Sequence, residues 1–325
     1  MKSQNLFVVL IASILTFTHL NAQESVKYEV LHNNPDEGMP NFRMRLNIWT
    51  DVNTTSQVYS SIGLLGDVYL GNRIGINYDV QHSWFTMAGF GGSRNASSYN
   101  YEIGGIYFFG NREIEKEYKV VLKVTSNSKT WGNTTTTSQT QKFIMVPNTK
   151  IKYLLGARAG LYLYAGDARK NHFDLDKING YAWDAAHFTA SGIYIGIMRL
   201  KVTNLKIKTD NYGECGGGMV NKFYADLLFT PLITATAVAG TDQFTESRDA
   251  TAAIIGKTPI GIRIGIENTP GALKEKGLSF KAECGYRPGI GSPFFGFGLG
   301  FRLLNRKILA FDNVKIGKKE TEATK

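Results

Sequence analysis

The chain has 325 residues, of which 43% are hydrophobic, and it contains 35 glycines but only 8 prolines. This length and composition allow one large all-β domain or two ordinary domains, and they exclude a disordered or collagen-like chain. Lysine and arginine outnumber aspartate and glutamate by 37 to 27, which gives a net charge of +10 and directs attention to anionic partners.

Residues 1–22 have the layout of a secretory signal peptide. Lys2 precedes the apolar run 6–17, and a polar segment follows with the small residue Ala22 at a plausible cleavage position. The run is too short and wrongly flanked for a membrane anchor, and the alternative is a buried N-terminal helix. Because an exported protein seldom meets nucleic acid, we expect no nucleic-acid partner. Anionic lipid head groups or small anions fit the basic charge better.

Residues 23–41 are expected to form a periplasmic or lumenal lead before the first strand. No later run approaches the roughly 18 apolar residues that a membrane helix requires, so a membrane location would depend on strands. From residue 42 onward, apolar side chains alternate with polar or charged ones, which is the period of a strand. This pattern appears at 42–49, 73–81, 118–124, 151–163, 259–267, 278–287 and 295–303.

The segment PIGIRIGIEN, residues 259–268, shows the pattern most clearly. One face carries Ile260, Ile262, Ile264 and Ile266, and the other carries Gly261, Arg263, Gly265 and Glu267. A soluble sandwich could bury such an apolar face against a second sheet. However, the strands are longer than the usual five or six residues, glycine crowds the polar face, and aromatic residues lie at strand ends. These features favour a transmembrane antiparallel β-barrel with a polar lumen.

Connection lengths predict an up-and-down barrel of about fourteen strands over residues 42–304, with both termini in the periplasm. Short connections are expected near residues 71–72, 110–116, 147–149, 203–204 and 231, with long polar loops between them. Between 186 and 240 the pattern weakens, because Ile193, Ile195 and Ile197 run into Arg199 and Lys201. Either Gly196 hosts a bulge or these cations reach the interface. About twelve strands result if two short segments there are loops. Residues 305–325 are expected to form a basic periplasmic tail.

Charged side chains on the inward face predict a basic lumen. The solute path is expected to be lined by Arg43, Arg45, Arg73, Asp79, Lys152, Arg158, Arg263, Glu267, Lys281, Glu283, Arg287 and Arg302. The full inward count adds Lys119, Lys123 and Lys222 to the bases, and Asp51, Asp67, Glu102 and Asp226 to the acids. The resulting excess of about five positive charges would require water or anions. The alternative is a salt-bridge network that fills the barrel.

A wet lumen has a consequence for stability. Because water screens an ion pair there as it does at a surface, removing Arg263 is expected to cost only about 1 kcal/mol.

Catalytic chemistry has little support in the sequence. No histidine has a metal-ligand spacing, and we expect no cofactor and no metal site. Lipid-processing barrel enzymes use a histidine and a serine two apart on one strand face. Here His82 and Ser83 lie on opposite faces, and His187 and Ser191 are too far apart. The two cysteines, Cys215 and Cys284, could form a disulfide or remain unpaired.

The signal peptide, the inward glycines and the segment FFGFGLGF at 294–301 resemble Gram-negative outer-membrane β-barrel proteins, with the character of barrels from the Bacteroidota. The resemblance covers residues 42–304 and implies a porin-like, narrow channel for small anionic or polar solutes. A non-conducting structural or accessory subunit is the alternative, and a lipid-modifying enzyme is a weaker one. The implied partners are outer-membrane lipid or lipopolysaccharide, small anions, and other outer-membrane proteins that contact the long outer loops.

Overall fold

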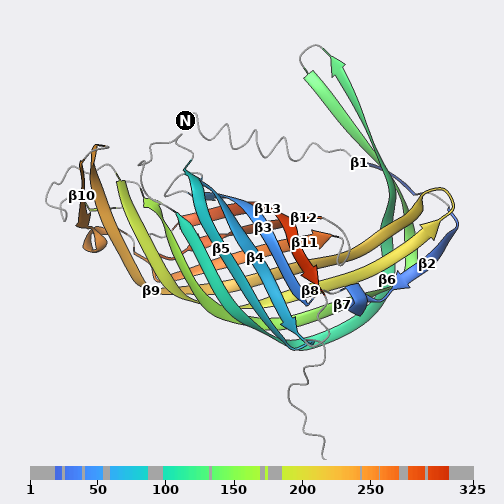
Figure 1. Ribbon diagram of the computed structural model, residues 1–325, viewed down its shortest axis with the longest axis horizontal. Coiled ribbons are helices and arrows are strands. Elements are labelled where there is room, and N and C mark those ends of the chain that lie inside the picture. Colours follow the sequence, from blue (N-terminus) through green and yellow to red (C-terminus); the bar gives the residue numbers. More distant parts are fainter. Residues whose placement is uncertain are drawn as a thin grey trace, which may run out of the picture. The chain divides into compact units, whose positions relative to one another are not determined.

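The computed structural model describes residues 19–23, 26–38, 41–53, 59–86, 98–131, 134–168, 173–174, 185–241, 244–255, 257–270, 277–289 and 292–306 (Figure 1). Their contacts divide the chain into two compact units. Unit 1 takes its residues from 1–35, 114–151 and 203–217, and unit 2 from 36–113, 152–202 and 218–325. No helix in the described part of the chain is long and apolar enough to cross a membrane.

Nearly all of the described structure is β-strand. The strands are β1 His19–Gln23, β2 Tyr28–Asn33, β3 Phe42–Asn53, β4 Tyr59–Leu70, β5 Ile74–Thr86, β6 Tyr99–Trp131, β7 Thr134–Ala168, β8 Ala185–Thr209, β9 Gly213–Thr241, β10 Phe244–Asp249, β11 Ile260–Pro270, β12 Leu278–Arg287 and β13 Ser292–Arg306. Two single turns of helix, α2 Pro35–Gly38 and η3 Thr251–Ala253, interrupt them. The predicted all-β class is therefore confirmed.

Ten strands pair in a closed circuit, β3-β4-β5-β6-β7-β8-β9-β11-β12-β13 and back to β3. The first and last of them are antiparallel neighbours, with Phe42 opposite Arg306 and Leu46 opposite Phe301. Strand β10 adds to β9 outside this circuit. The antiparallel barrel predicted from the sequence is present, with ten strands in its circuit instead of about fourteen.

The lower count arises because four predicted turns lie inside long strands. Strands β6, β7, β8 and β9 each unite two predicted strands. Pro147 and Asn148 are both exposed between buried neighbours, and Asn148 has a φ of 53°. Pro231 and Leu232 also break the alternation of burial without ending β9. These residues mark bulge-like irregularities, and proline or a positive φ occurs at bulges as well as at turns.

Along the strands of unit 2, outward rows of apolar side chains are exposed, whereas charged side chains on inward rows are buried. On β11, Ile264 has 46% of its surface exposed, whereas Arg263 has 5% and Glu267 has 1%. The same arrangement recurs around the circuit, with exposed Ile48, Leu64, Ile76, Ile103, Phe109, Leu161, Ile195, Phe223, Leu227, Leu278, Phe297 and Leu299. The predicted assignment of the two faces of PIGIRIGIEN is confirmed.

Inward glycines in unit 2 make room for aromatic rings. A Cβ atom added to Gly296 would lie 1.9 Å from Cζ2 of Trp49, and one added to Gly265 would lie 2.2 Å from Cζ of Tyr224. Since real Cβ atoms never approach so closely, any larger residue at these positions would displace the ring. The glycines are therefore part of how the interior of unit 2 is filled.

Unit 1 has the opposite arrangement. Its core consists of buried Val120, Ile144, Val146, Leu205 and Ile207 from β6, β7 and β8. Lys119 and Lys123 are exposed on the other face of β6. The prediction that these two lysines point into a lumen is wrong, because Tyr118, Val120 and Leu122 on the opposite face pack in the core of unit 1.

Two further strands pair within unit 1. Strand β1 pairs in parallel with Gln139–Phe143 of β7, and β2 pairs antiparallel with β8. Strand β1 overlaps the predicted signal peptide and β2 lies in the predicted lead. Cleavage after Ala22 stays a prediction, and the expected tail beyond Arg306 lies outside the described residues.

Candidate functional site

The interior of unit 2 holds two groups of buried ion pairs. The first, which we call the Asp67 cluster, contains Arg43, Arg45, Lys222, Asp67 and Glu267. Asp67 accepts from Arg43 and from Lys222, each at 2.6 Å. Glu267 lies 2.7 Å from Nη1 of Arg45 and 3.2 Å from Nζ of Lys222. Three cations therefore share two carboxylates that are almost completely buried.

The second group, the Arg263 cluster, contains Arg158, Arg263, Lys281, Asp79, Glu102, Asp226 and Glu283. Arg263 donates to Asp226 through Nε at 2.9 Å and through Nη2 at 2.7 Å, and it also pairs with Glu102. Lys281 bridges Asp79 at 2.7 Å and Glu283 at 2.8 Å. Here four carboxylates share three cations.

Aromatic rings cover the cations of the Arg263 cluster. The guanidinium of Arg158 lies 4.8 Å from the ring centre of Tyr194 and 4.4 Å from that of Tyr224. Nζ of Lys281 lies 4.9 Å from the ring of Trp49. Such contacts stabilise a cation where water is excluded. Tyr224 also donates its hydroxyl to Glu283, so the rings belong to the polar network as well as to the packing.

Two more predicted lumen residues form separate ion pairs. Arg287 pairs with Asp51, and its guanidinium lies 4.2 Å from the ring centres of both Tyr164 and Phe294. Lys152 pairs with Asp36 of α2 and donates to the side-chain oxygen of Asn72 at 3.2 Å. The acid that balances Lys152 therefore comes from the segment predicted to be a lead.

Charges inside unit 2 balance. The seven cations Arg43, Arg45, Arg158, Lys222, Arg263, Lys281 and Arg287 pair with the seven carboxylates Asp51, Asp67, Asp79, Glu102, Asp226, Glu267 and Glu283. The predicted excess of about five positive charges is wrong for the described residues. The predicted count includes Lys119 and Lys123 of unit 1 as well as Arg73 and Arg302, which lie outside the buried clusters, and it omits Asp36.

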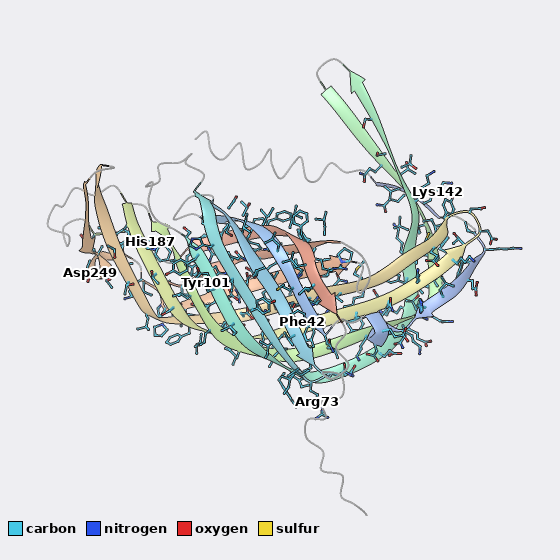
Figure 2. The ribbon with its side chains drawn as sticks, viewed as in Figure 1. Phe42, Arg73, Tyr101, Lys142, His187 and Asp249 are labelled. Atoms are coloured by element: carbon cyan, nitrogen blue, oxygen red, sulfur yellow. The ribbon has the colours of Figure 1, made fainter. Side chains whose placement is uncertain are left out.

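Two of the predicted lumen residues lie away from the clusters. Arg73 is exposed in the turn that follows β4, where Figure 2 labels it. Arg302 is only half-buried and donates to the carbonyl of Pro270. The structure brings the remaining ten predicted residues into the clusters and the two separate pairs described above.

Apolar side chains fill further parts of unit 2. One group joins Tyr162, Tyr164, Phe188, Tyr194, Leu228 and Ile233 with small residues that include Ala250, which precedes η3, and Ala253, its last residue. A second joins Tyr69, Ile106, Phe108, Leu154, Met198, Leu200, Val202, Val220 and Tyr224. Buried groups of this kind are typical of a filled barrel interior rather than of an aqueous channel.

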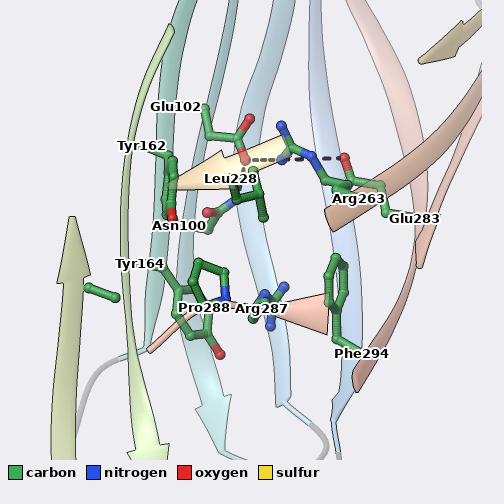
Figure 3. Close-up of a pocket in the computed structure, with 11 residues that line it drawn as sticks. Asn100, Glu102, Tyr162, Tyr164, Leu228, Arg263, Glu283, Arg287, Pro288 and Phe294 are labelled. Carbon is green, nitrogen blue, oxygen red and sulfur yellow. Dashed lines mark hydrogen bonds and ion pairs between the residues drawn. The ribbon is translucent and has the colours of Figure 1, made fainter. Parts of the chain in front are cut away.

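A small cavity of about 30 Å³ lies beside the Arg263 cluster (Figure 3). Its walls include Glu102, Arg263, Glu283, Arg287 and the ring of Phe294. Figure 3 shows Arg263 between the carboxylates of Glu102 and Glu283. This volume exceeds the roughly 10 to 15 Å³ that one bound water requires, so the cavity has room for ordered water.

The tyrosines of this interior were not among the predicted site residues. A signal for them exists, because Tyr194 lies between outward Ile193 and Ile195, and Tyr224 lies between inward Lys222 and Asp226. The strand period alone would have placed both inside. Asp36 has no such signal, since α2 lies outside any alternating segment.

No group of three or more histidine, cysteine, aspartate or glutamate side chains among the described residues could hold a metal ion. Nδ1 of His82 lies 3.4 Å from the hydroxyl of Tyr101, whereas the hydroxyl of Ser83 donates to the carbonyl of Ser60. His187 is half-buried on β8. Cys215 and Cys284 are both free thiols, and partial burial raises the pKa of Cys215 in unit 1.

No protein-family model matches this chain, and no curated protein is similar to it in sequence. Among solved structures, the CymD monoaromatic hydrocarbon channel is 8% identical, with a TM-score of 0.21 over 81% of this chain and 89% of that chain. OmpT, an outer membrane protein of Vibrio cholerae, is 10% identical, with a TM-score of 0.19 over 85% of this chain and all of that chain. Salmonella typhi OmpF in complex with daunomycin is 9% identical, with the same TM-score of 0.19 and coverage of 85% and 100%. These similarities are too low to indicate a function, which must therefore be inferred from the structure of this chain.

Proposed function

We propose that unit 2 spans the bacterial outer membrane as a closed β-barrel and serves there as a non-conducting structural or accessory component. The exposed face of unit 2 supports a membrane location, because its long strands carry Ile, Leu and Phe where a water-soluble barrel would carry polar residues. A closed circuit also leaves no strand edge to face lipid.

The balance of buried charge is the observation that carries the non-conducting role. In the Asp67 and Arg263 clusters, every cation has a carboxylate within 4 Å, and the aromatic groups described above occupy neighbouring space. An ion entering this interior would have to separate such pairs, and breaking a buried pair costs several kcal/mol. The salt-bridge network is therefore the better account of the inward charges.

A narrow channel for small anionic or polar solutes is the second candidate. One observation favours it: Arg43 and Arg45 each have two buried guanidinium nitrogens without a hydrogen-bond partner among the described residues. Because a buried N–H without a partner is costly, internal water is expected beside them. A hydrated path would require this water to connect with the cavity at Arg263.

The expectations about export, topology and partners are part of the same proposal. Export by the signal peptide, periplasmic termini, contact with outer-membrane lipid and contact with other outer-membrane proteins all fit a membrane-embedded barrel. A lipid-modifying activity is the weakest alternative, because His82 and Ser83 have different partners. Replacing His82 by alanine is expected to leave lipid composition unchanged.

Current recording across planar bilayers tests the proposal. Purified protein is inserted, and insertion is verified by a shift in gel mobility between unheated and heated samples. We expect no unitary current steps from the native chain. Regular steps would overturn the non-conducting role and support the channel, and a preference for chloride over potassium would restore the predicted basic path.

A further inference from the structure

The outward row of β8 changes character within unit 2. Ile193, Ile195 and Ile197 are exposed on this row, and Arg199 is the next exposed residue. At the alternate positions Tyr194, Met198 and Leu200 are buried, so the alternation keeps its phase and no bulge at Gly196 is needed. Lys201, two residues further along, is half-buried on the same row. The outward row of β8 therefore changes from three isoleucines to two basic residues without a polar residue between them.

If unit 2 spans a membrane, this change indicates where the hydrocarbon core of the bilayer ends along β8. A guanidinium or ammonium group on the lipid face of a barrel costs several kcal/mol at the bilayer midplane and little near the interface. Arg199 lies about 13 Å along the strand from Ile195, at roughly 3.3 Å per residue. If Ile195 is in hydrocarbon, Arg199 and Lys201 reach the level of the lipid head groups.

The neighbouring strand changes at a matching position. Tyr153 of β7 comes just before Leu155 and Leu161 on the same outward row, and the guanidinium of Arg199 lies 5.8 Å from the ring centre of Tyr153. Tyrosine is enriched at the membrane–water interface because its ring is apolar and its hydroxyl is polar. The two strands together place a ring and two cations side by side.

Neither cation has a carboxylate partner within the part of the chain that the structure describes. In this respect Arg199 and Lys201 differ from Lys206 of unit 1, which pairs with Glu214. They also differ from the cations inside unit 2, each of which is paired. An external anion is the partner that would complete this site.

We propose that Arg199, Lys201 and Tyr153 bind the phosphodiester of an anionic glycerophospholipid on the outer face of unit 2. Arginine matches a phosphate with two parallel N–H donors, and a lysine beside it adds a second positive charge. This inference rests on the proposed membrane location.

Strand direction indicates which leaflet supplies the lipid. In an up-and-down circuit β8 runs in the same direction as β4, whose Val68 pairs with Phe42 at the start of β3. The Lys201 end of β8 therefore lies at the end of unit 2 where β3 begins and β13 finishes. With periplasmic termini this end faces the inner leaflet, which is built of glycerophospholipid and not of lipopolysaccharide.

Lipid titration followed by native mass spectrometry tests the site. The full chain in detergent is titrated with phosphatidylglycerol or phosphatidylcholine, and bound lipids are counted. We expect the native chain to prefer phosphatidylglycerol and R199Q/K201Q to bind it about 25-fold more weakly, at roughly fivefold for each cation. K116Q/K123Q, which removes the same charge from exposed positions of unit 1, is the matched control and should bind as the native chain does.

The outcomes distinguish failure of the proposed lipid site from failure of the proposed membrane location. Equal affinity of the native chain and R199Q/K201Q for phosphatidylglycerol would overturn the site. Displacement by millimolar inorganic phosphate, or a stronger R199-dependent affinity for lipopolysaccharide, would overturn the phospholipid as its source. R199K keeps the positive charge at this position. It should therefore bind phosphatidylglycerol more tightly than R199Q/K201Q does if the site is correctly folded. Failure of the native chain to insert into liposomes would instead overturn the membrane location.

Discussion

Units 1 and 2 are built from the same alternation and use it in opposite ways. In unit 1, β6 buries Val120 and exposes Lys123, as a water-soluble sheet does. In unit 2, β11 exposes Ile264 and buries Arg263. A period of two establishes that the faces of a strand differ, and it does not establish which face meets water. What surrounds the strand decides the orientation of burial.

The largest expected effect comes from removing a buried charge of unit 2. Arg263→Gln leaves Asp226 and Glu102 without their main cation, and breaking a buried pair costs about 3 to 5 kcal/mol. Urea unfolding in liposomes measures it, with the exposed K123Q of unit 1 as control. A loss near 1 kcal/mol would show that water screens the pair, as the wet lumen expected from the sequence requires.

The next effect separates lipid from water on two exposed faces. Ile264 of unit 2 and Val124 of unit 1 are exposed to 46% and 51%. Ile264→Arg should destabilise the chain by about 2 to 4 kcal/mol near the bilayer midplane. Val124→Arg should change stability by less than about 0.5 kcal/mol if water surrounds this exposed face of unit 1. Similar losses for both variants in liposome unfolding would remove the distinction between the units.

A smaller effect is expected at the native thiols. Cys284 lies on the exposed face of β12 opposite Ile264, so lipid should protect it from a charged, water-soluble thiol reagent in liposomes. Cys215 should react slowly at neutral pH and faster as the pH rises, because its raised pKa keeps the thiolate fraction low. Mass spectrometry of labelled peptides reads both sites. Labelling of Cys284 in intact liposomes would place that face in water.

The smallest effect is expected at a surface pair of unit 1. Glu214 is exposed, and its hydrogen bond from Lys206 holds the pKa of its carboxyl below the usual value. A lowered pKa stabilises the folded state above the unfolded pKa, and this contribution is lost as the pH falls. Glu214→Gln should therefore leave unfolding at pH 7 nearly unchanged, as exposed pairs generally do. A loss as large as that of Arg263→Gln would mean that unit 1 is not exposed to water as described.

Much of unit 2 could be predicted from the sequence, because its segments alternate strictly. Arg43, Arg158, Arg263, Glu267 and Lys281 were all placed on the inward face, where the structure has them. The clusters they form could not be predicted, since register between distant strands decides which acid meets which base. Lys222, for example, reaches Asp67 from a strand 155 residues away in the sequence.

The errors have local physical causes. The sequence predicts turns at Pro147 and Pro231, but each residue lies within a long strand at an irregularity of the alternation. Lys119 and Lys123 were placed in a lumen because the polarity of a strand was assumed to be the same along the whole chain. The core of unit 1, which includes Val120 and Leu205, shows that it is not.

Collision accessibility of spin labels tests the central claim most directly. Labels are attached to single cysteines at positions 264 and 124 in a background without native cysteines, and the protein is reconstituted in liposomes. We expect position 264 to be accessible to oxygen and protected from a water-soluble nickel chelate, and position 124 to show the reverse. Equal access of the nickel chelate to both positions would contradict the claim that the exposed apolar face of unit 2 lies in lipid.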